Sequence, residues 1–562
     1  MASTDLSTPW EMLPDEMVLT ILDLLAPRDV QALSKINSRT QNLCVPALFR
    51  TVSLPTLPAL SAFIYAVPTS RRHLIRELDI CTKPTADYDS DQNVYEDELA
   101  MTDGTSENKD KSSVTKTIIE LLTTTPALEK LGLSVAGALE YSIIPVLESL
   151  ARVKYFDLRN YAREEVTPLS ERLAVRLAFC FPSLSSLSLT RIARSAIHAP
   201  ELHGIYPYVP IVHGDATVPP APYPICDMLR LPALLRIKTL RKLRIRDTHL
   251  GDPLWDDAAW EVGMSDASTI APLEVLDLGA CALESPAFNE RCTMRILSNV
   301  RSTITSFAVS GGMATGIPSS DVLQVNPLSA VVVPTLRTAG THLATTARPT
   351  NRPSLPLLKT LHLTPLLSPS ALAPTLAQPQ FALSPVHTLA CTFHPDDAAD
   401  GCAALAEFLD VNRTPRSSST TADHNKCAEQ MRGGAHTYTH SHFSALRTIR
   451  VAIASEEKPI SPSPRLSARA AARLRAEREA QRVAAVRLRA LCKELGLEAS
   501  IAVAGCDEFE QEVRAVQDKQ CGERRVVFAE PVSMETGGCV RDAGSTSTSG
   551  RFSGQRSRAK TT

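Results

Sequence analysis

One short apolar pattern constrains this chain more than any other feature. An apolar residue, two other residues, a second apolar residue, one other residue and a third apolar residue recur between residues 75 and 451. Alternate side chains of a strand point to the same face, so the last two apolar residues of each copy share a face. The pattern predicts short strands with one buried face at Ile75-Leu78-Ile80, Leu128-Leu131-Leu133, Val153-Phe156-Leu158, Leu184-Leu187-Leu189, Leu240-Leu243-Ile245, Leu273-Leu276-Leu278, Ile304-Phe307-Val309, Leu358-Leu361-Leu363, Val386-Leu389-Cys391 and Leu446-Ile449-Val451.

Helical patterns fill the intervals between these copies, at 114–122, 143–150, 173–179 and 294–300. A strand and a helix that alternate every 25 to 35 residues, roughly, predict an α/β fold. The copy ending at Leu158 continues to Asn160, and the copy ending at Leu278 continues to Cys281.

Leucine-rich repeats place an Asn or a Cys at these positions, and the pattern as a whole resembles a leucine-rich-repeat solenoid. Such an array grows in one direction, so 562 residues need no single compact core. The alternative is a doubly wound sheet, whose strands read as continuous apolar runs because both faces are buried. Here the residues between the apolar positions are polar or small, which favours one open face.

The resemblance implies an irregular solenoid over residues 55–510 with long disordered insertions. We expect these insertions at about 83–113, 200–224, 317–353 and 413–442. The first is acidic and carries too few apolar residues to offset the entropy cost of ordering.

The C-terminal part of the chain ends the array. An Ala- and Arg-rich stretch predicts a terminal helix at 465–495, with Gly496 as its C-cap and a last strand at 497–503. A helix of this kind binds a membrane or a partner, or it closes a solenoid with a polar outer face, which is the interpretation we favour. The tail at 530–562 is expected to be disordered.

The N-terminal stretch predicts three short helices. Asp15 and Glu16 follow Pro14 at the positive end of a first helix, and Pro27 ends that helix and begins a second. About 45 residues in three helices cannot bury this much apolar surface unaided. The unit therefore packs on its own chain, on a partner, or on both.

Residues 9–54 resemble an F-box, and with the repeats the chain resembles fungal F-box proteins with leucine-rich repeats. The matching elements are Leu13-Pro14-Asp15-Glu16, Ile21-Leu22, Pro27-Arg28-Asp29-Val30 and Leu48-Phe49-Arg50-Thr51-Val52-Ser53-Leu54, while Ser38-Arg39-Thr40-Gln41 departs from the family pattern. The resemblance implies a three-helix F-box that docks on a Skp-type adaptor, and through it on a cullin and a RING protein. The implied adaptor-binding residues are Leu13, Pro14, Glu16, Val18, Ile21, Leu22, Leu25, Val30, Leu33, Ile36, Leu43, Leu48 and Phe49.

The same resemblance implies the substrate-recognition subunit of an SCF-type E3 ubiquitin ligase, whose repeats bind an unknown protein target. Residues between the inward ones face the concave side. The candidate target-binding residues are Tyr155, Arg159, Lys242, Arg244, Arg246 and His362. The basic residues at 242–246 suggest an acidic or phosphorylated peptide, although a solvated strand end explains them as well. The competing function is a non-degradative interaction scaffold.

The chain offers few features of an enzyme. It contains no Gly-x-Ser-x-Gly, no phosphate-binding loop and no His-Glu-x-x-His, so we expect no catalytic residues and no cofactor. His436, His440, His442 and Cys427 lack the spacing of a metal site, and we expect no metal. The paired carboxylates after Trp255 read as a surface turn.

Charge, hydropathy and cysteine usage set the expected surroundings. A formal charge of -2 gives no basic field, so nucleic acid is not an expected partner. No signal peptide or run of about 18 apolar residues is present, so we expect no membrane association. The 13 cysteines form no pairs with metal or disulfide spacing, which favours a reducing compartment, cytoplasmic, nuclear or both.

Overall fold

The structure is a computed structural model. It describes residues 10, 12–83, 107–135, 139–161, 169–198, 211–221, 229–252, 255, 271–280, 286–310, 354–363, 369–413, 443, 445–453, 468–502 and 526–527. The predictions for residues 317–353, 414–442 and 530–562 therefore lie outside the described residues. These include the segment with His436, His440, His442 and Cys427.

A large parallel sheet organises the described chain. Its strands are β1 (Thr51–Leu54), β2 (Glu77–Cys81), β3 (Lys130–Val135), β4 (Tyr155–Asn160), β6 (Ser186–Thr190), β9 (Lys242–Thr248), β10 (Val275–Ala280), β11 (Ser306–Ser310), β12 (Thr360–Leu363), β13 (Thr388–Phe393), β14 (Thr448–Ile453), β15 (Glu498–Ile501) and β16 (Val526–Val527). From β1 to β15 the neighbours follow chain order without a reversal, and β16 pairs with the outer side of β1. A doubly wound sheet has such a reversal, so that alternative is wrong.

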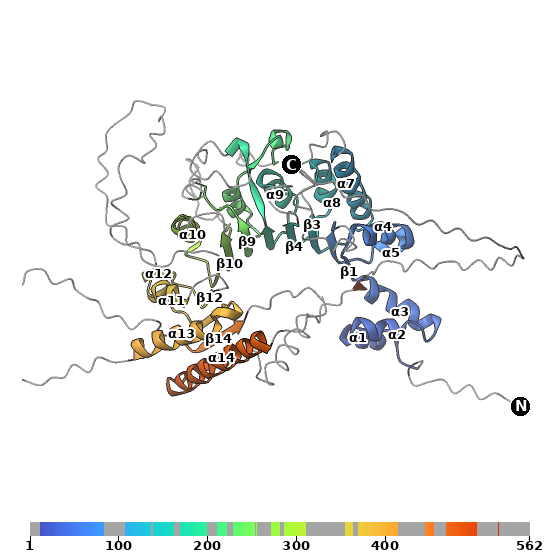
Figure 1. Cartoon of the computed structure of the whole chain (residues 1–562). Helices are drawn as coiled ribbons and strands as arrows, with labels where there is room; N and C mark the ends of the chain where they lie inside the picture. The colour runs from blue at the N-terminus through green and yellow to red at the C-terminus, as the bar shows by residue number, and fades with distance from the viewer. Residues whose placement is uncertain are drawn as a thin grey trace, which may run out of the picture.

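All ten predicted strands are present, and the predicted last strand is β15. The strands follow an arc in Figure 1, with connecting helices along its outer side. These helices are α4 (Leu57–Ala66), α5 (Thr69–Arg72), α7 (Glu107–Thr123), α8 (Ile144–Ser149), α9 (Glu171–Ala178), α10 (Pro286–Val300), α11 (Pro369–Leu376), α12 (Pro379–Ala382), α13 (Ala398–Arg413) and α14 (Ala468–Glu494). Short 3-10 helices are η1 (Tyr141–Ile143), η2 (Ala196–His198), η3 (Asp215–Thr217), η4 (Leu231–Arg236) and η9 (Pro395–Asp397).

Burial alternates along the strands, as the sequence pattern predicts. In β3, for example, Leu131, Leu133 and Val135 are buried while the residues between them are partly exposed. The buried side chains of successive strands join one continuous core with the helices. One face of the sheet is therefore packed and the other is open to solvent.

Four sequence expectations need correction. Residues 51–54, assigned to the N-terminal helical module, form β1 and belong to the sheet. The insertion at 83–113 is shorter, because α7 already begins at Glu107. The insertion at 200–224 holds β8 (Ile211–Val212) and η3, and β8 forms a small sheet with β5 (Leu169–Ser170) and β7 (Ile192–Ser195). Trp255, predicted in a surface turn, is fully buried.

The C-terminal helix ends as predicted. Gly496 follows α14 with a positive φ of 68°. Leu488 is buried against the main core, and Ala484, Leu491 and Leu495 pack around it. The apolar stripe expected for this helix therefore faces the rest of the chain.

Gly401, a glycine of helix α13, tests how tightly this helix packs on the sheet. A Cβ added to Gly401 in α13 would lie 2.5 Å from a ring carbon of buried Phe393. We expect overpacking in Gly401→Ala to lower the free energy of unfolding by about 1 to 3 kcal/mol. The higher helix propensity of alanine should offset about 1 kcal/mol of this loss. The control is Gly132→Ala, where the Cβ would meet Asp79 Oδ1 at 2.5 Å, the mobile end of a side chain. Urea unfolding of both variants decides, and equal stabilities would contradict the tight packing.

Candidate functional site

The three N-terminal helices, α1 (Asp15–Leu24), α2 (Pro27–Leu33) and α3 (Ser38–Phe49), form a unit with its own core. Val18, Leu22, Val30 and Cys44 are buried there, separately from the core of the sheet. We call residues 12–50 the helical unit. Figure 1 shows it beyond β1, at the end of the arc of strands.

Polar contacts fix the first helix against the third. Arg39 Nη2 donates to Asp15 Oδ1 at 2.6 Å and to the carbonyl of Leu13 at 2.5 Å. Asn37 caps α3 by accepting a hydrogen bond from the backbone N–H of Thr40 at 2.8 Å. These bonds hold α1 against α3 and cap the start of α3.

Two apolar stripes run along α1. Val18, Leu22 and the following Leu25 turn toward the core of the helical unit. Met17 and Leu24 lie one position earlier, on an adjacent face, and they are 53% and 84% exposed. The unit therefore covers one stripe by itself and leaves the other open to solvent.

The predicted adaptor-binding residues divide into three groups by burial. Val18, Leu22 and Val30 are buried inside the helical unit, and Phe49 is half-buried and packs against the core of the sheet. The other half-buried members are Leu13, Ile21, Leu25, Leu33, Leu43 and Leu48, and the exposed ones are Pro14, Glu16 and Ile36. Sequence reasoning missed the exposed Met12, Met17, Leu19 and Leu24. Their signal is an apolar residue directly beside each inward one.

The open face of the sheet carries two hollows. The first, which we call the face groove, has a volume of about 340 Å³ and crosses β1 to β10. The second, which we call the edge cleft, has about 790 Å³ and lies between the helical unit and the first residues of β2, β3 and β4. Its apolar wall is Leu19, Pro46, Ala47 and Leu74.

Four of the six predicted target-binding residues line the face groove: Tyr155, Arg159, Lys242 and Arg244. Arg246 borders it, because it shares Asp277 with Arg244. Asp277 Oδ2 lies 3.2 Å from Arg244 Nε and 2.8 Å from Arg246 Nη2. The sequence pattern therefore placed these five side chains in one region of the open face.

His362 is on the same face but outside the groove. Its Nε2 lies 2.9 Å from Thr392 Oγ1 on β13, away from the basic residues of β9. Burial lowers the pKa of His362, and the Arg246 charge lowers it further, while Asp277 opposes both effects. His362 is therefore not an added cation near neutral pH.

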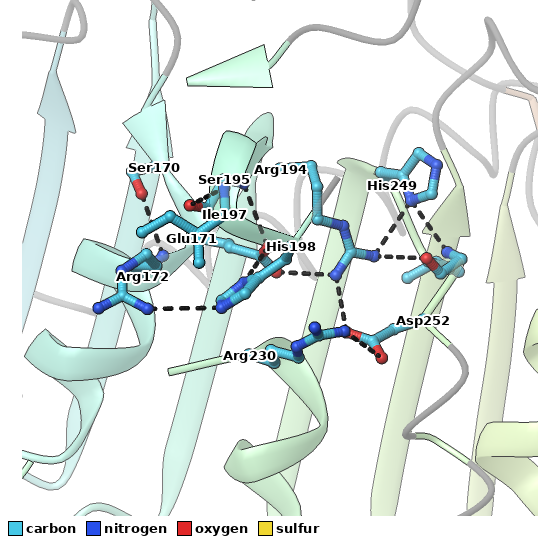
Figure 2. Close-up of polar contacts among 12 residues, drawn as sticks. Ser170, Glu171, Arg172, Arg194, Ser195, Ile197, His198, Arg230, His249 and Asp252 are labelled. Carbon is cyan, nitrogen blue, oxygen red and sulfur yellow. Dashed lines mark hydrogen bonds and ion pairs between the residues drawn. The ribbon is translucent and has the colours of Figure 1, made fainter. Parts of the chain in front are cut away.

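A second cluster of charged side chains is buried where α9, β7 and the residues after β9 meet (Figure 2). Arg194 on β7 is at its centre, with no exposed side-chain surface. Its Nη1 lies 2.9 Å from Glu171 Oε2 and 2.8 Å from Asp252 Oδ2, and its Nη2 donates to the carbonyl of Gly251 at 2.7 Å. Arg230 approaches Asp252 Oδ1 at 3.6 Å. We call these groups and their neighbours the buried network.

The hydrogen-bond donors around two histidines fix their form. Arg172 Nη1 lies 3.4 Å from His198 Nε2, so this nitrogen accepts and Nδ1–H donates to Glu171 Oε1 at 2.8 Å. His249 Nδ1 likewise faces Arg194 Nη2 at 3.2 Å and the N–H of Gly251 at 3.0 Å.

The buried network holds the insertion around the small sheet in place. Asp215 of η3 accepts from Ser195 Oγ at 2.8 Å and from Ser170, while Arg172 donates to its carbonyl. Burial opposes the ionised form of Glu171, yet the Arg194 charge and the His198 hydrogen bond hold the pKa of Glu171 below its ordinary value of 4.5. None of these groups lines the face groove or the edge cleft.

Several thiols of the described chain are buried, Cys180 and Cys391 among them. Burial raises the pKa of the Cys180 and Cys391 thiols to about 12, which keeps them protonated and unreactive. Within the described ranges, no group of three or more His, Cys, Asp or Glu side chains is placed to hold a metal ion. Of the helices in those ranges, none has the length and apolar character to span a bilayer.

Comparison of the sequence with protein-family models and with curated proteins finds no match. Two surfaces of the described chain are candidate binding sites: the exposed apolar side chains of the helical unit, and the face groove with the edge cleft.

Proposed function

We propose that this chain is the substrate-recognition subunit of an SCF-type ubiquitin ligase. In this proposal the helical unit is an F-box that docks on a Skp-type adaptor. The strands and helices behind it are an irregular leucine-rich-repeat solenoid whose open face binds a target protein. The chain performs no bond chemistry, and it acts by holding a target beside a ubiquitin-charged enzyme.

One observation carries the proposal: the helical unit completes a core of its own and still leaves apolar side chains on its surface. Met17, Leu24 and Ile36 are 53%, 84% and 60% exposed within one short unit. Several exposed apolar side chains on so small a unit favour a protein interaction site there. The residue signature that resembles an F-box lies on the same segment.

The position of the helical unit also suits a bridging subunit. Arg50 follows α3 directly, and its carbonyl accepts from the N–H groups of Arg76 and Glu77, both at 2.9 Å. The unit is thus tied to the first strands by backbone bonds rather than by a long linker. A target on the open face would be held at a fixed distance from the adaptor.

Adaptor binding tests the proposal. We expect Leu24→Asp and Ile36→Asp each to weaken binding of the full chain to a recombinant Skp-type adaptor at least tenfold, because burying a charge costs about 2 kcal/mol or more. Titration calorimetry gives the affinities. The matched control is Tyr65→Asp on α4, a side chain 95% exposed and outside the helical unit.

Wild-type protein that fails to bind the adaptor would contradict the proposal. Adaptor binding without ubiquitination of any co-purified protein, in a complete set of ligase components, would favour the scaffold alternative. A truncated protein used alongside these variants lacks residues 1–50 and begins at Thr51, because removing residues 51–54 as well would delete β1.

A further inference from the structure

The face groove and the edge cleft adjoin each other. Glu77, Lys130 and Tyr155 line both hollows, and each is the first residue of its strand. Tyr155 is 46% exposed, so an aromatic ring stands at the junction. Tyrosine at such a place offers a large apolar area at a low cost in conformational entropy.

The strand register gives the distance from the junction to the basic residues. Tyr155 pairs with Ser186, and Ser186 pairs with Lys242, so two strand spacings separate Tyr155 from Lys242. Neighbouring strands are about 4.8 Å apart, which makes this about 10 Å. An extended peptide that crosses the strands covers that distance in about three residues.

Positive charge exceeds negative charge at the far end of this path. Arg159 is bound to Asp157, and Arg244 and Arg246 share Asp277. Lys242 adds a further cation, and among the described residues no acidic side chain pairs with it. Burial lowers the pKa of Arg244 most, the Arg246 and Arg159 charges lower it further, and Asp277 and Asp157 oppose them. This end therefore attracts an anion.

We propose that the face groove and the adjoining edge cleft together bind an extended peptide segment with two anchors three residues apart. An apolar side chain enters the edge cleft beside Tyr155 and Leu19. An anionic side chain lies over Lys242 and Arg244. This inference rests on the proposed function, in which the open face receives a target protein, and it names the class of segment that the target presents.

Synthetic peptides test the spacing. The probe is a nine-residue fluorescent peptide of Gly, Ser and Ala that carries one Leu and one anionic residue, separated by one, three or six positions. Two series distinguish the sources of negative charge, one with Glu and one with phosphoserine. With the full chain in fluorescence polarisation, we expect the three-position peptide to bind at least fivefold more tightly than the other two. Equal binding of all spacings would overturn the proposal.

Variants locate the two anchors. Lys242→Glu with Arg244→Glu should weaken binding at least tenfold, and a peptide with Lys in place of the anion should then bind the variant better than the original peptide does. Tyr155→Ala should weaken binding of the Leu peptide but not of its Leu→Gly version. The matched control is Arg450→Glu, which shares the face and the row of Arg244 but lies on β14, outside the groove.

The outcome is separable from that of the proposed function. Peptide binding without adaptor binding would leave the groove assignment standing and overturn the ligase role. Adaptor binding without any spacing-dependent peptide binding, or with unchanged binding in the Lys242 and Arg244 variant, would overturn the groove assignment and leave the adaptor role standing.

Discussion

Replacing Arg194 by methionine is expected to cost about 3 to 5 kcal/mol of the free energy of unfolding at pH 7. The arginine side chain is fully buried between Glu171 and Asp252, which are also buried. Methionine fills similar space but leaves two carboxylates without their central counter-charge. The loss therefore comes from uncompensated buried charge, and urea unfolding measures it.

The pH dependence of this loss identifies its cause. In the wild type the folded state lowers the pKa of Glu171. The contribution of Glu171 to stability is therefore complete above its ordinary pKa of 4.5, and it is lost as the pH falls through the folded-state pKa. Without Arg194, burial dominates and raises the pKa of Glu171, so protonation relieves the variant as the pH falls. The stability difference between the two proteins should be large at pH 7 and smaller at pH 4.

Two further variants separate charge from packing. Arg191→Met removes a surface arginine that lies 3.9 Å from Asp247, and we expect a cost below about 1 kcal/mol. Adding Glu171→Gln and Asp252→Asn to Arg194→Met should recover part of the loss, because fewer charges then stay buried. A loss that is equal at both pH values and unaffected by these additions would contradict the electrostatic origin.

The sequence predicts the strands from β2 to β15 in the large sheet because their apolar pattern is periodic and local. Every Leu-x-x-Leu-x-Leu copy became a strand, since two inward residues in each are enough to set its face. The sequence does not predict β1, because Thr51–Leu54 lie within the stretch that resembles a three-helix F-box. The small sheet was missed because β5 and β8 have only two residues each, too few for any period to appear.

The two surfaces differ in how far sequence could reach them. Strand alternation placed Lys242 and Arg244 on the open face, because alternation fixes the side on which each residue lies. It gave no sign of Asp277, which neutralises part of their charge from the next strand. In α1 the regular stripe of Val18 and Leu22 proved to be the inner face. A single periodic stripe does not say whether a helix covers it with its own chain or with a partner.

Phe307→Ala is expected to destabilise the protein by about 3 to 5 kcal/mol. Phe307 on β11 is fully buried and stacks on Phe381 of α12, with ring centroids 5.9 Å apart and planes inclined by 16°. The truncation removes the ring from the core and leaves Phe381 without its partner. Phe307→Leu, which keeps most of the volume, should cost about 1 to 1.5 kcal/mol, and Ser306→Ala on the open face should be close to neutral.

The strand order predicts which part of the sheet the Phe307→Ala substitution destabilises most. β11 joins β10 to β12, and the strands on either side pair with their own neighbours in chain order. Weakening β11 should therefore loosen the part from β12 to β14 relative to the part from β2 to β4. Hydrogen exchange followed by mass spectrometry should show faster exchange in β12–β14 of Phe307→Ala and little change in β2–β4. Uniform acceleration of both parts would mean that the sheet unfolds as one cooperative body, despite its single-file order.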